Sequence, residues 1–213
     1  MPTSTDPPTL TRGHKKKART RRLLLDTALE VLAEQGEGFA VADIAVRAGV
    51  SHGTLYNYFA DREHLVNELV SDLVETFAAR SAAEVDDPDP AVRFARISAR
   101  ALASATAMPE TVRVALRLEA AQRVLLIDGP LAYLRQDLAD GCASGRFSSQ
   151  PDDGTLDVMV GSLLLAARRI VDGQHDLVYR ATVIGRLLQA LGVDAGDAAS
   201  IARREVGGAA TLG

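Results

Sequence analysis

Apolar residues recur at intervals of three and four along most of this chain, the spacing that gathers them on one face of an α-helix. The series Leu65, Leu69, Leu73 and Phe77 is one example. The pattern stops at proline and glycine, as at Gly129-Pro130, where a helix has to end. Runs of β-branched residues, which favour strands, are few. The pattern therefore predicts an all-α protein of about nine helices.

Within residues 41–59 the pattern predicts two short helices joined by a turn at Gly49. Glycine adopts turn conformations that are costly for any residue with a Cβ atom. Ser51 follows the turn, and its hydroxyl can cap the next helix by accepting a hydrogen bond from a backbone N–H two or three residues on. The apolar residues that turn to one core are Ile44, Leu55 and Phe59.

The other face of the helix after Gly49 lacks the Lys and Glu that are usual on a solvated helix. Polar and aromatic side chains of this kind suit the base edges in the DNA major groove. We therefore interpret residues 41–59 as a helix-turn-helix. The alternative is an ordinary pair of packed helices, but turn, cap and aromatic residues occur together here, which favours DNA binding. The residues of this face are His52, Thr54, Tyr56, Asn57 and Tyr58.

Residues 21–70 resemble the DNA-binding domain of the TetR family of bacterial transcriptional regulators. The family's run of Ile-Ala, Ala-Gly-Val-Ser, Gly-Thr-Leu-Tyr and Tyr-Phe stands here at residues 44–45, 48–51, 53–56 and 58–59. Its opening helix is similar to residues 23–36.

One position departs from the family pattern. The family usually has a Ser or Thr that caps the helix before the turn and can also touch a phosphate. This chain has Phe39-Ala40-Val41-Ala42 there. The resemblance therefore predicts that this cap and this phosphate contact are both missing.

The motif and the basic residues before it supply the candidate DNA contacts. We expect His52, Thr54 and Tyr56 at base or sugar edges, and the side chains of Asn57, Tyr58 and His64 at phosphates. Backbone N–H groups at the start of the reading helix can also donate to phosphate. The complete candidate set is Lys16, Lys17, Arg21, Arg22, Val41, Ser51, His52, Gly53, Thr54, Tyr56, Asn57, Tyr58 and His64.

The formal net charge of −4 is unusual for a DNA-binding protein until it is divided along the chain. Residues 1–65 carry +1, and the remainder carries −5. A basic arm precedes the motif. Such an arm can be a disordered, solubilising tail, but beside this motif we expect it to lie along the phosphates or to reach the minor groove. The seven positive charges of the arm are Arg12, Lys15, Lys16, Lys17, Arg19, Arg21 and Arg22.

We divide the chain into a flexible basic arm (1–20), a helix-turn-helix DNA-binding domain (21–66) and a helical domain for ligand binding and dimerisation (67–213). Two helices predicted at 155–171 and 176–191 are apolar over most of their circumference, so one face against the body cannot bury both. The resemblance implies that two such helices from each subunit form a homodimer, which presents two reading helices to a palindromic operator. The alternative is a monomeric bundle that buries both helices.

The resemblance also implies a small-molecule effector, held by the helices between residues 90 and 171. Apolar residues predominate there, and a few polar side chains could anchor an apolar or anionic molecule. The alternative is that these helices form an ordinary apolar interior. The candidate anchors are Arg113, Arg117, Tyr133 and Arg168.

Several other classes of protein do not fit the sequence. Cys142 is the only cysteine, so no internal disulfide forms, and no set of Cys and His has the spacing of a zinc site. The first residues contain no apolar core of a signal peptide, and the longest apolar run, Leu163–Ala167, is too short to cross a bilayer. We expect a cytoplasmic protein without membrane partner or cofactor.

The four histidines are scattered, and the chain has neither a Gly-rich phosphate loop nor a nucleophile elbow, which argues against an enzyme. The favoured interpretation is a ligand-responsive, homodimeric repressor that binds a palindromic DNA operator. The alternative is an architectural DNA-binding protein whose body binds no ligand.

Overall fold

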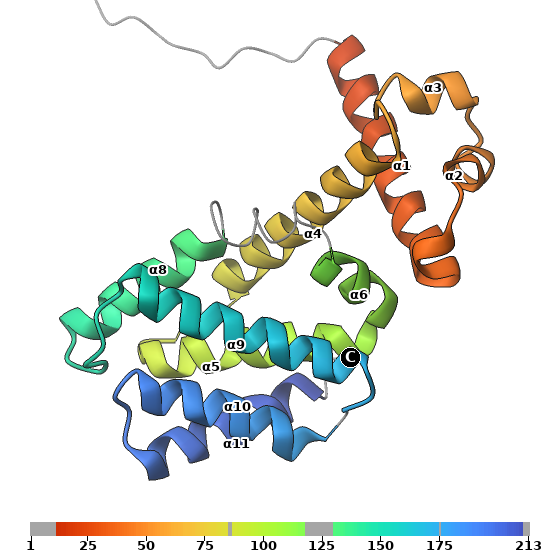
Figure 1. The fold of residues 1–213 in the computed structure, drawn as a ribbon. Coiled ribbons are helices and arrows are strands. Elements are labelled where there is room, and N and C mark those ends of the chain that lie inside the picture. Colours follow the sequence, from red (N-terminus) through yellow and green to blue (C-terminus); the bar gives the residue numbers. More distant parts are fainter. Residues whose placement is uncertain (1–11, 85–86, 118–129, 175, 211–213) are drawn as a thin grey trace, which may run out of the picture. The chain divides into compact units, whose positions relative to one another are not determined.

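The computed structural model describes residues 12–84, 87–117, 130–174 and 176–210, and every regular element in these ranges is helical (Figure 1). The predicted all-α fold is confirmed. The described residues form ten α-helices and one short 3-10 helix, where the sequence indicated about nine helices. No helix among them is long and apolar enough to span a membrane.

The chain divides into two compact units, Met1–Leu69 and Val70–Gly213. The first unit has a core of fully buried side chains that includes Leu24 and Leu65. Ile44, Leu55 and Phe59 are each at most 1% exposed, so the common core expected for these three residues is confirmed. The elements of this unit are α1 (Arg12–Gln35), η1 (Gly36–Gly38), α2 (Val41–Arg47), α3 (His52–Tyr56) and the start of α4 (Arg62–Glu84).

The first helix begins earlier than the sequence pattern indicated. Residues 12–20, which we assigned to a flexible arm, form the first turns of α1. Lys and Arg are good helix formers, and the side chains of Lys15, Lys16 and Lys17 are exposed on this helix. The basic residues therefore belong to the same helix, α1, whose later residue Leu24 is buried in the core of the unit.

The second unit is arranged around α5 (Figure 1). This helix packs against α8, α9, α10 and α11, and its side chains Phe94 and Leu102 are buried. Its elements after α4 are α5 (Pro90–Ala107), α6 (Pro109–Arg117), α8 (Pro130–Ala143), α9 (Asp153–Val171), α10 (Leu177–Ala190) and α11 (Ala195–Ala210).

Aspartate side chains cap the starts of α5, α9 and α10. Asp89 accepts a hydrogen bond from the backbone N–H of Ala91 at 2.8 Å, and Pro90 occupies the first helical position. The expected start of a helix at Asp89-Pro90 is thus confirmed. Asp152 and Asp176 cap α9 and α10 in the same way.

Helix α11 is an element that the sequence analysis missed. Its start is marked by Asp194, which accepts hydrogen bonds from the N–H groups of Gly196 and Asp197. Its buried side chains Ala198, Ile201 and Val206 follow helical spacing. The helix packs on α10 and α5 and so buries part of the apolar surface for which we had expected only a partner subunit.

Two arginines join α5 to α11 through carboxylates. Arg96 Nε lies 2.7 Å from Glu205 Oε2, and Arg146 Nη2 bridges Asp89, at 2.9 Å, and Asp197, at 2.7 Å. Burial acts to raise the pKa of Asp89 and of Glu205, but hydrogen bonds from the arginines outweigh it, so both pKa values are lowered. The ion pairs therefore stabilise the unit only while these carboxylates are ionised.

This arrangement predicts acid-sensitive stability. Because both folded-state pKa values are lowered, the contribution is complete above the ordinary values of 3.8 and 4.5 and is lost as the pH falls through and below them. We expect Asp89→Asn, which keeps a capping oxygen, to lower the melting temperature at pH 7 and to approach the wild type as the pH falls below the ordinary aspartate pKa of 3.8 and through the lower pKa of the folded state. The measurement is thermal unfolding from pH 3 to 7.

The control is Asp153→Asn, which removes a carboxylate whose side chain is 89% exposed. It should leave the pH profile nearly unchanged. A parallel displacement of the Asp89→Asn curve at every pH would contradict the assigned role of the charge.

Candidate nucleic-acid interface

The turn between α2 and α3 fixes how α3 is presented. Gly49 has φ of 67°, in the left-handed region that favours glycine, and α2 ends there. The N–H of Val50 then donates to the carbonyl of Ala45 at 3.0 Å, which closes the turn. The turn predicted at Gly49 is confirmed.

Ser51 caps α3 as expected. Its hydroxyl accepts a hydrogen bond from the N–H of Thr54 at 3.1 Å and lies 2.9 Å from the hydroxyl of Thr54. Thr54 is half-buried, and its hydroxyl already interacts with the hydroxyl of Ser51 in the absence of DNA. A base contact by Thr54 stays a prediction.

The outward face of α3 is polar and exposed. Tyr56 is 49% exposed, while Leu55, its neighbour in sequence, is 1% exposed and anchors the helix from the opposite side. His52 and Asn57 are also exposed, and Tyr58 is half-buried. The structure thus brings most of the candidate base and phosphate contacts together on one short helix and the residues that follow it.

The start of α2 lacks a side-chain cap. Ala40 occupies the N-cap position and makes no capping hydrogen bond through a side chain, as predicted from the departure at residues 39–42. Val41, the first residue of α2, is half-buried, so little of its side chain is available to DNA. A DNA contact at Val41 stays a prediction.

The basic candidates fall into two classes. Lys16 and Lys17 are exposed on the first turns of α1. Arg21 pairs with Glu68, and Arg22 pairs with Asp26 at 2.7 Å. A phosphate has to compete with these carboxylates for the two arginines, whereas both lysines extend into solvent.

His64 has a structural role that the sequence analysis missed. The backbone N–H of His64 donates to Asp61 Oδ1 at 2.7 Å, and the ring Nδ1 of His64 accepts from the backbone N–H of Ala60 at 3.1 Å. Both side chains thus satisfy backbone N–H groups at the start of α4. The nitrogen Nδ1 is therefore occupied, and Nε2 lies 3.6 Å from Glu68. The predicted phosphate contact of His64 is untested, and its ring is already held by these neighbours.

The candidate ligand anchors do not form a cluster in the part of the chain that the structure describes. Arg113 on α6 pairs with Glu110 and donates to the carbonyl of Val171 at 3.2 Å. Arg168 is exposed on α9. The side chains of Arg117 and Tyr133 lie outside the described residues.

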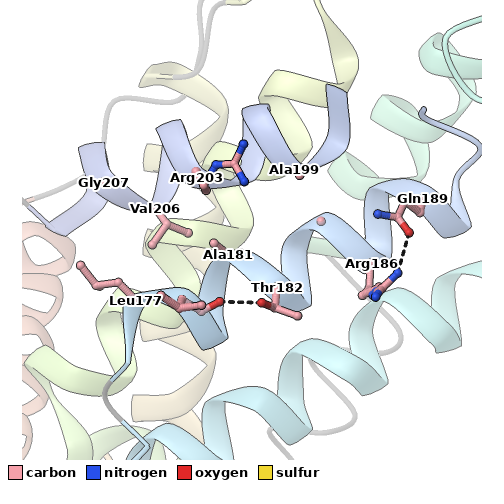
Figure 2. Close-up of a pocket in the computed structure, with 11 residues that line it drawn as sticks. Leu177, Ala181, Thr182, Arg186, Gln189, Ala199, Arg203, Val206 and Gly207 are labelled. Carbon is pink, nitrogen blue, oxygen red and sulfur yellow. Dashed lines mark hydrogen bonds between the residues drawn. The ribbon is translucent and has the colours of Figure 1, made fainter. Parts of the chain in front are cut away.

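Apolar surface remains exposed on the helices of the second unit. On α9, Val158 is 52% and Leu165 is 55% exposed, with Gly161 between them on the same face. A groove of about 400 Å³ runs between α10 and α11, with Ala181 and Val206 among its apolar lining residues and Arg186 beside them (Figure 2). At one end of it, Val178 is 70% exposed.

Comparisons with known proteins agree with this geometry. Residues 24–69 match the family model described as bacterial regulatory proteins, tetR family. The structure of RolR in complex with resorcinol superposes with a TM-score of 0.71 at 28% identity, covering 88% of this chain and 95% of that one. Residues 24–69 are therefore a TetR-family DNA-binding domain.

Other TetR relatives agree over different lengths. The fatty acid metabolism regulator protein of Bacillus subtilis is 26% identical over 191 residues, which are 82% of this chain and 96% of that protein. The repressor KstR2 of Mycobacterium tuberculosis is 39% identical over 64 residues, or 30% of this chain and 32% of KstR2. These relatives are named as regulators. This chain, with its TetR-type DNA-binding domain, is a DNA-binding transcriptional regulator.

The missing cap of α2 leads to a stability prediction. Replacing Ala40 by Ser supplies an oxygen to the first backbone N–H groups of α2 and should raise the free energy of unfolding of the first unit by about 1 kcal/mol. Chemical denaturation followed by circular dichroism measures the change. The matched control is Ala42→Ser, inside the first turn, where a hydroxyl cannot cap. An equal effect of the two substitutions would refute the capping explanation.

The two classes of DNA contact should separate in binding experiments. Tyr56→Phe should reduce discrimination between operator and random DNA by about 1–3 kcal/mol if its hydroxyl contacts a base edge. Replacing Lys16 and Lys17 by Ala should weaken both DNAs alike and reduce the slope of log affinity against log salt by about 0.9 for each phosphate that the protein no longer neutralises. Salt titrations of fluorescence anisotropy measure both. An equal reduction of affinity for the two DNAs in Tyr56→Phe would assign Tyr56 to the backbone instead.

Proposed function

We propose that this protein is a ligand-responsive repressor that binds a palindromic operator as a homodimer. The observation that carries the proposal is the outward polar face of α3, held by the buried side chains of Leu55 and Phe59. A helix of five residues has no stability of its own, so the core determines where its polar side chains point. A side-chain face held in a fixed direction in this way can make specific contacts with base edges in the major groove.

The contacts divide between specificity and affinity. His52, Tyr56 and Asn57 are exposed at or beside α3 and carry hydrogen-bonding groups suited to base edges or nearby phosphates. Lys16 and Lys17 supply charge that attracts any DNA. A repressor needs both, since charge without base contacts gives binding at every sequence.

The exposed apolar surface supports dimerisation through residues 155–171 and 176–191. Val158 and Leu165 flank Gly161 on α9, where the absent side chain permits a second helix to approach closely. Val178 and Leu177 are exposed at the start of α10. In a twofold dimer each copy offers the same apolar surface to the other, so one patch covers its counterpart. Two reading helices about 34 Å apart then meet successive turns of the major groove.

DNA binding and ligand binding are assigned to different parts of the chain. Residues 21–66 carry the reading helix, and residues 67–213 carry the exposed apolar helices and the candidate ligand anchors. The chain's similarity to RolR, which is described in complex with resorcinol, supports a small-molecule effector for this chain as well. An effector that prefers a shape unfavourable to the operator weakens DNA binding, and the operator weakens effector binding by the same factor.

The function is tested by recovering the DNA that the purified protein selects from a pool of genomic fragments. The expected result is a small set of sites with twofold sequence symmetry, bound with a stoichiometry of two chains per site. Failure to retain any double-stranded fragment at low ionic strength would overturn the proposal. Reporter transcription from a recovered site, with and without the protein, then distinguishes repression from activation.

Substitutions on the exposed apolar surface test the dimer. Val178→Glu or Leu165→Glu buries a charge in the interface and should convert the dimer to monomers at micromolar concentration. Operator affinity should fall at least about tenfold, which corresponds to about 1.4 kcal/mol. Analytical ultracentrifugation and band shifts measure the two effects. The control Gln150→Glu changes an exposed loop residue and should affect neither.

A further inference from the structure

One arginine of the second unit is buried without a carboxylate partner among the residues that the structure describes. Arg180 on α10 is 6% exposed, and its Nη2 donates to the hydroxyl of Thr106 near the end of α5. Its Nε is enclosed and has no hydrogen-bond partner. Within the described residues Arg180 has no ion pair. A fixed positive charge is therefore held inside the unit with one donor unused.

Other arginines of the second unit show that this is unusual among its described residues. Arg93, Arg96 and Arg146 are each half-buried, and each is paired with a carboxylate. Arg113 is paired with Glu110. Arg180 is more deeply buried than these residues, and the cost of burying a charge rises when no opposite charge accompanies it.

The chemistry of the group leaves few ways to reduce this cost. Burial lowers the pKa of Arg180, but a guanidinium starts so far above neutrality that the side chain stays charged. The hydroxyl of Thr106 removes only part of the desolvation penalty, because it carries no charge. An anion in contact with Nε would supply both the missing acceptor and the missing charge.

A second unused polar atom lies in the same unit. Thr111 on α6 is 4% exposed, and its hydroxyl has no hydrogen-bond partner. Thr106 lies in the last turn of α5 and Thr111 in the first turn of α6, so both residues flank the junction of these helices. In Figure 1, α6 lies beside the end of α9, and Arg113 donates to Val171 there. Arg180 contacts this junction from the first turn of α10.

We propose that Arg180 binds the carboxylate of the effector, a small apolar acid, at the junction of α5, α6 and α10. This inference rests on the proposed ligand-responsive function and names the class of ligand. Glu110 already neutralises the nearby Arg113, so only the positive charge of Arg180 remains to be balanced. A ligand with a single negative charge is therefore favoured. An apolar remainder fits the core, since Ile184 follows Arg180 by one turn on α10 and is fully buried.

Binding at this position is coupled to a change of shape. Nε is enclosed, so a carboxylate reaches it only when the groups that cover it move. We expect this opening where Arg180 meets Thr106, so that the acid selects a state in which the end of α5 and the start of α10 are separated. An effector has to discriminate between two shapes in this manner to act on DNA binding.

The test uses the full chain and three sodium salts, acetate, octanoate and benzoate, at constant ionic strength against chloride. The matched neutral probes are acetamide, octanamide and benzamide. At least one carboxylate should raise the melting temperature of the wild type by several degrees while its amide does not. In Arg180→Met this protection should disappear. Protection by none of the carboxylates, or equal protection by the amides, overturns the proposal, as does protection by inorganic phosphate alone.

Two further measurements separate a binding role from a structural one. Without ligand, Arg180→Met should melt at the wild-type temperature or above, because it removes an unpaired buried charge; a marked decrease would assign Arg180 to holding the end of α5 and overturn the proposal. The matched control is Arg204→Met, which removes an exposed arginine while Glu205 keeps its pair with Arg96. It should retain protection by the carboxylate.

DNA binding distinguishes failure of this inference from failure of the proposed function. Wild type and Arg180→Met should bind a recovered operator alike without acid, and the protecting acid should weaken only the wild type, by about fivefold or more. Operator binding that no acid affects rejects the assignment of Arg180 and leaves the DNA-binding function in place. Absence of any operator binding rejects the function itself.

Discussion

Burial of Leu55 and Phe59 against the core of the first unit is the constraint on which DNA recognition depends. Helix α3 has five residues, too few to be stable in isolation. Gly49 turns the chain, Ser51 caps the helix, and the two apolar side chains fix its rotation. The polar face is consequently rigid before DNA arrives, and base contacts can be made without a large entropic cost of ordering the helix.

The charge distribution resolves the conflict between a net charge of −4 and a nucleic-acid ligand. The pair of Arg21 with Glu68 joins α1 to α4, and the pair of Arg22 with Asp26 lies within α1, so both arginines present less free charge to DNA. Lys16 and Lys17 are exposed and belong to neither of these pairs, so their charges are available to phosphates.

The helix-turn-helix was predictable because its determinants are local: turn, cap and apolar spacing all fall within residues 41–59. Helix α11 had similar signals after Asp194, but Gly196, Gly207 and Gly208 weaken its helical propensity, and packing on α5 and α10 provides what propensity lacks. The role of Arg180 was not predictable at all. Its partner Thr106 lies 74 residues earlier, and burial without a carboxylate follows only from the packing of whole helices.

The unpaired charge of Arg180 and the many paired arginines of the same unit fit one physical account of regulation. Ion pairs such as Arg146 with Asp89 and Asp197 hold α5 and α11 in one arrangement, so that part of the unit is rigid. At the opposite end of α5, Arg180 is held by a single neutral hydroxyl, and separation there costs less. An anion that binds Arg180 gains the free energy of a charge-assisted hydrogen bond and breaks only one neutral hydrogen bond. The proposed change of shape is therefore expected at the end of α5 that contacts Arg180.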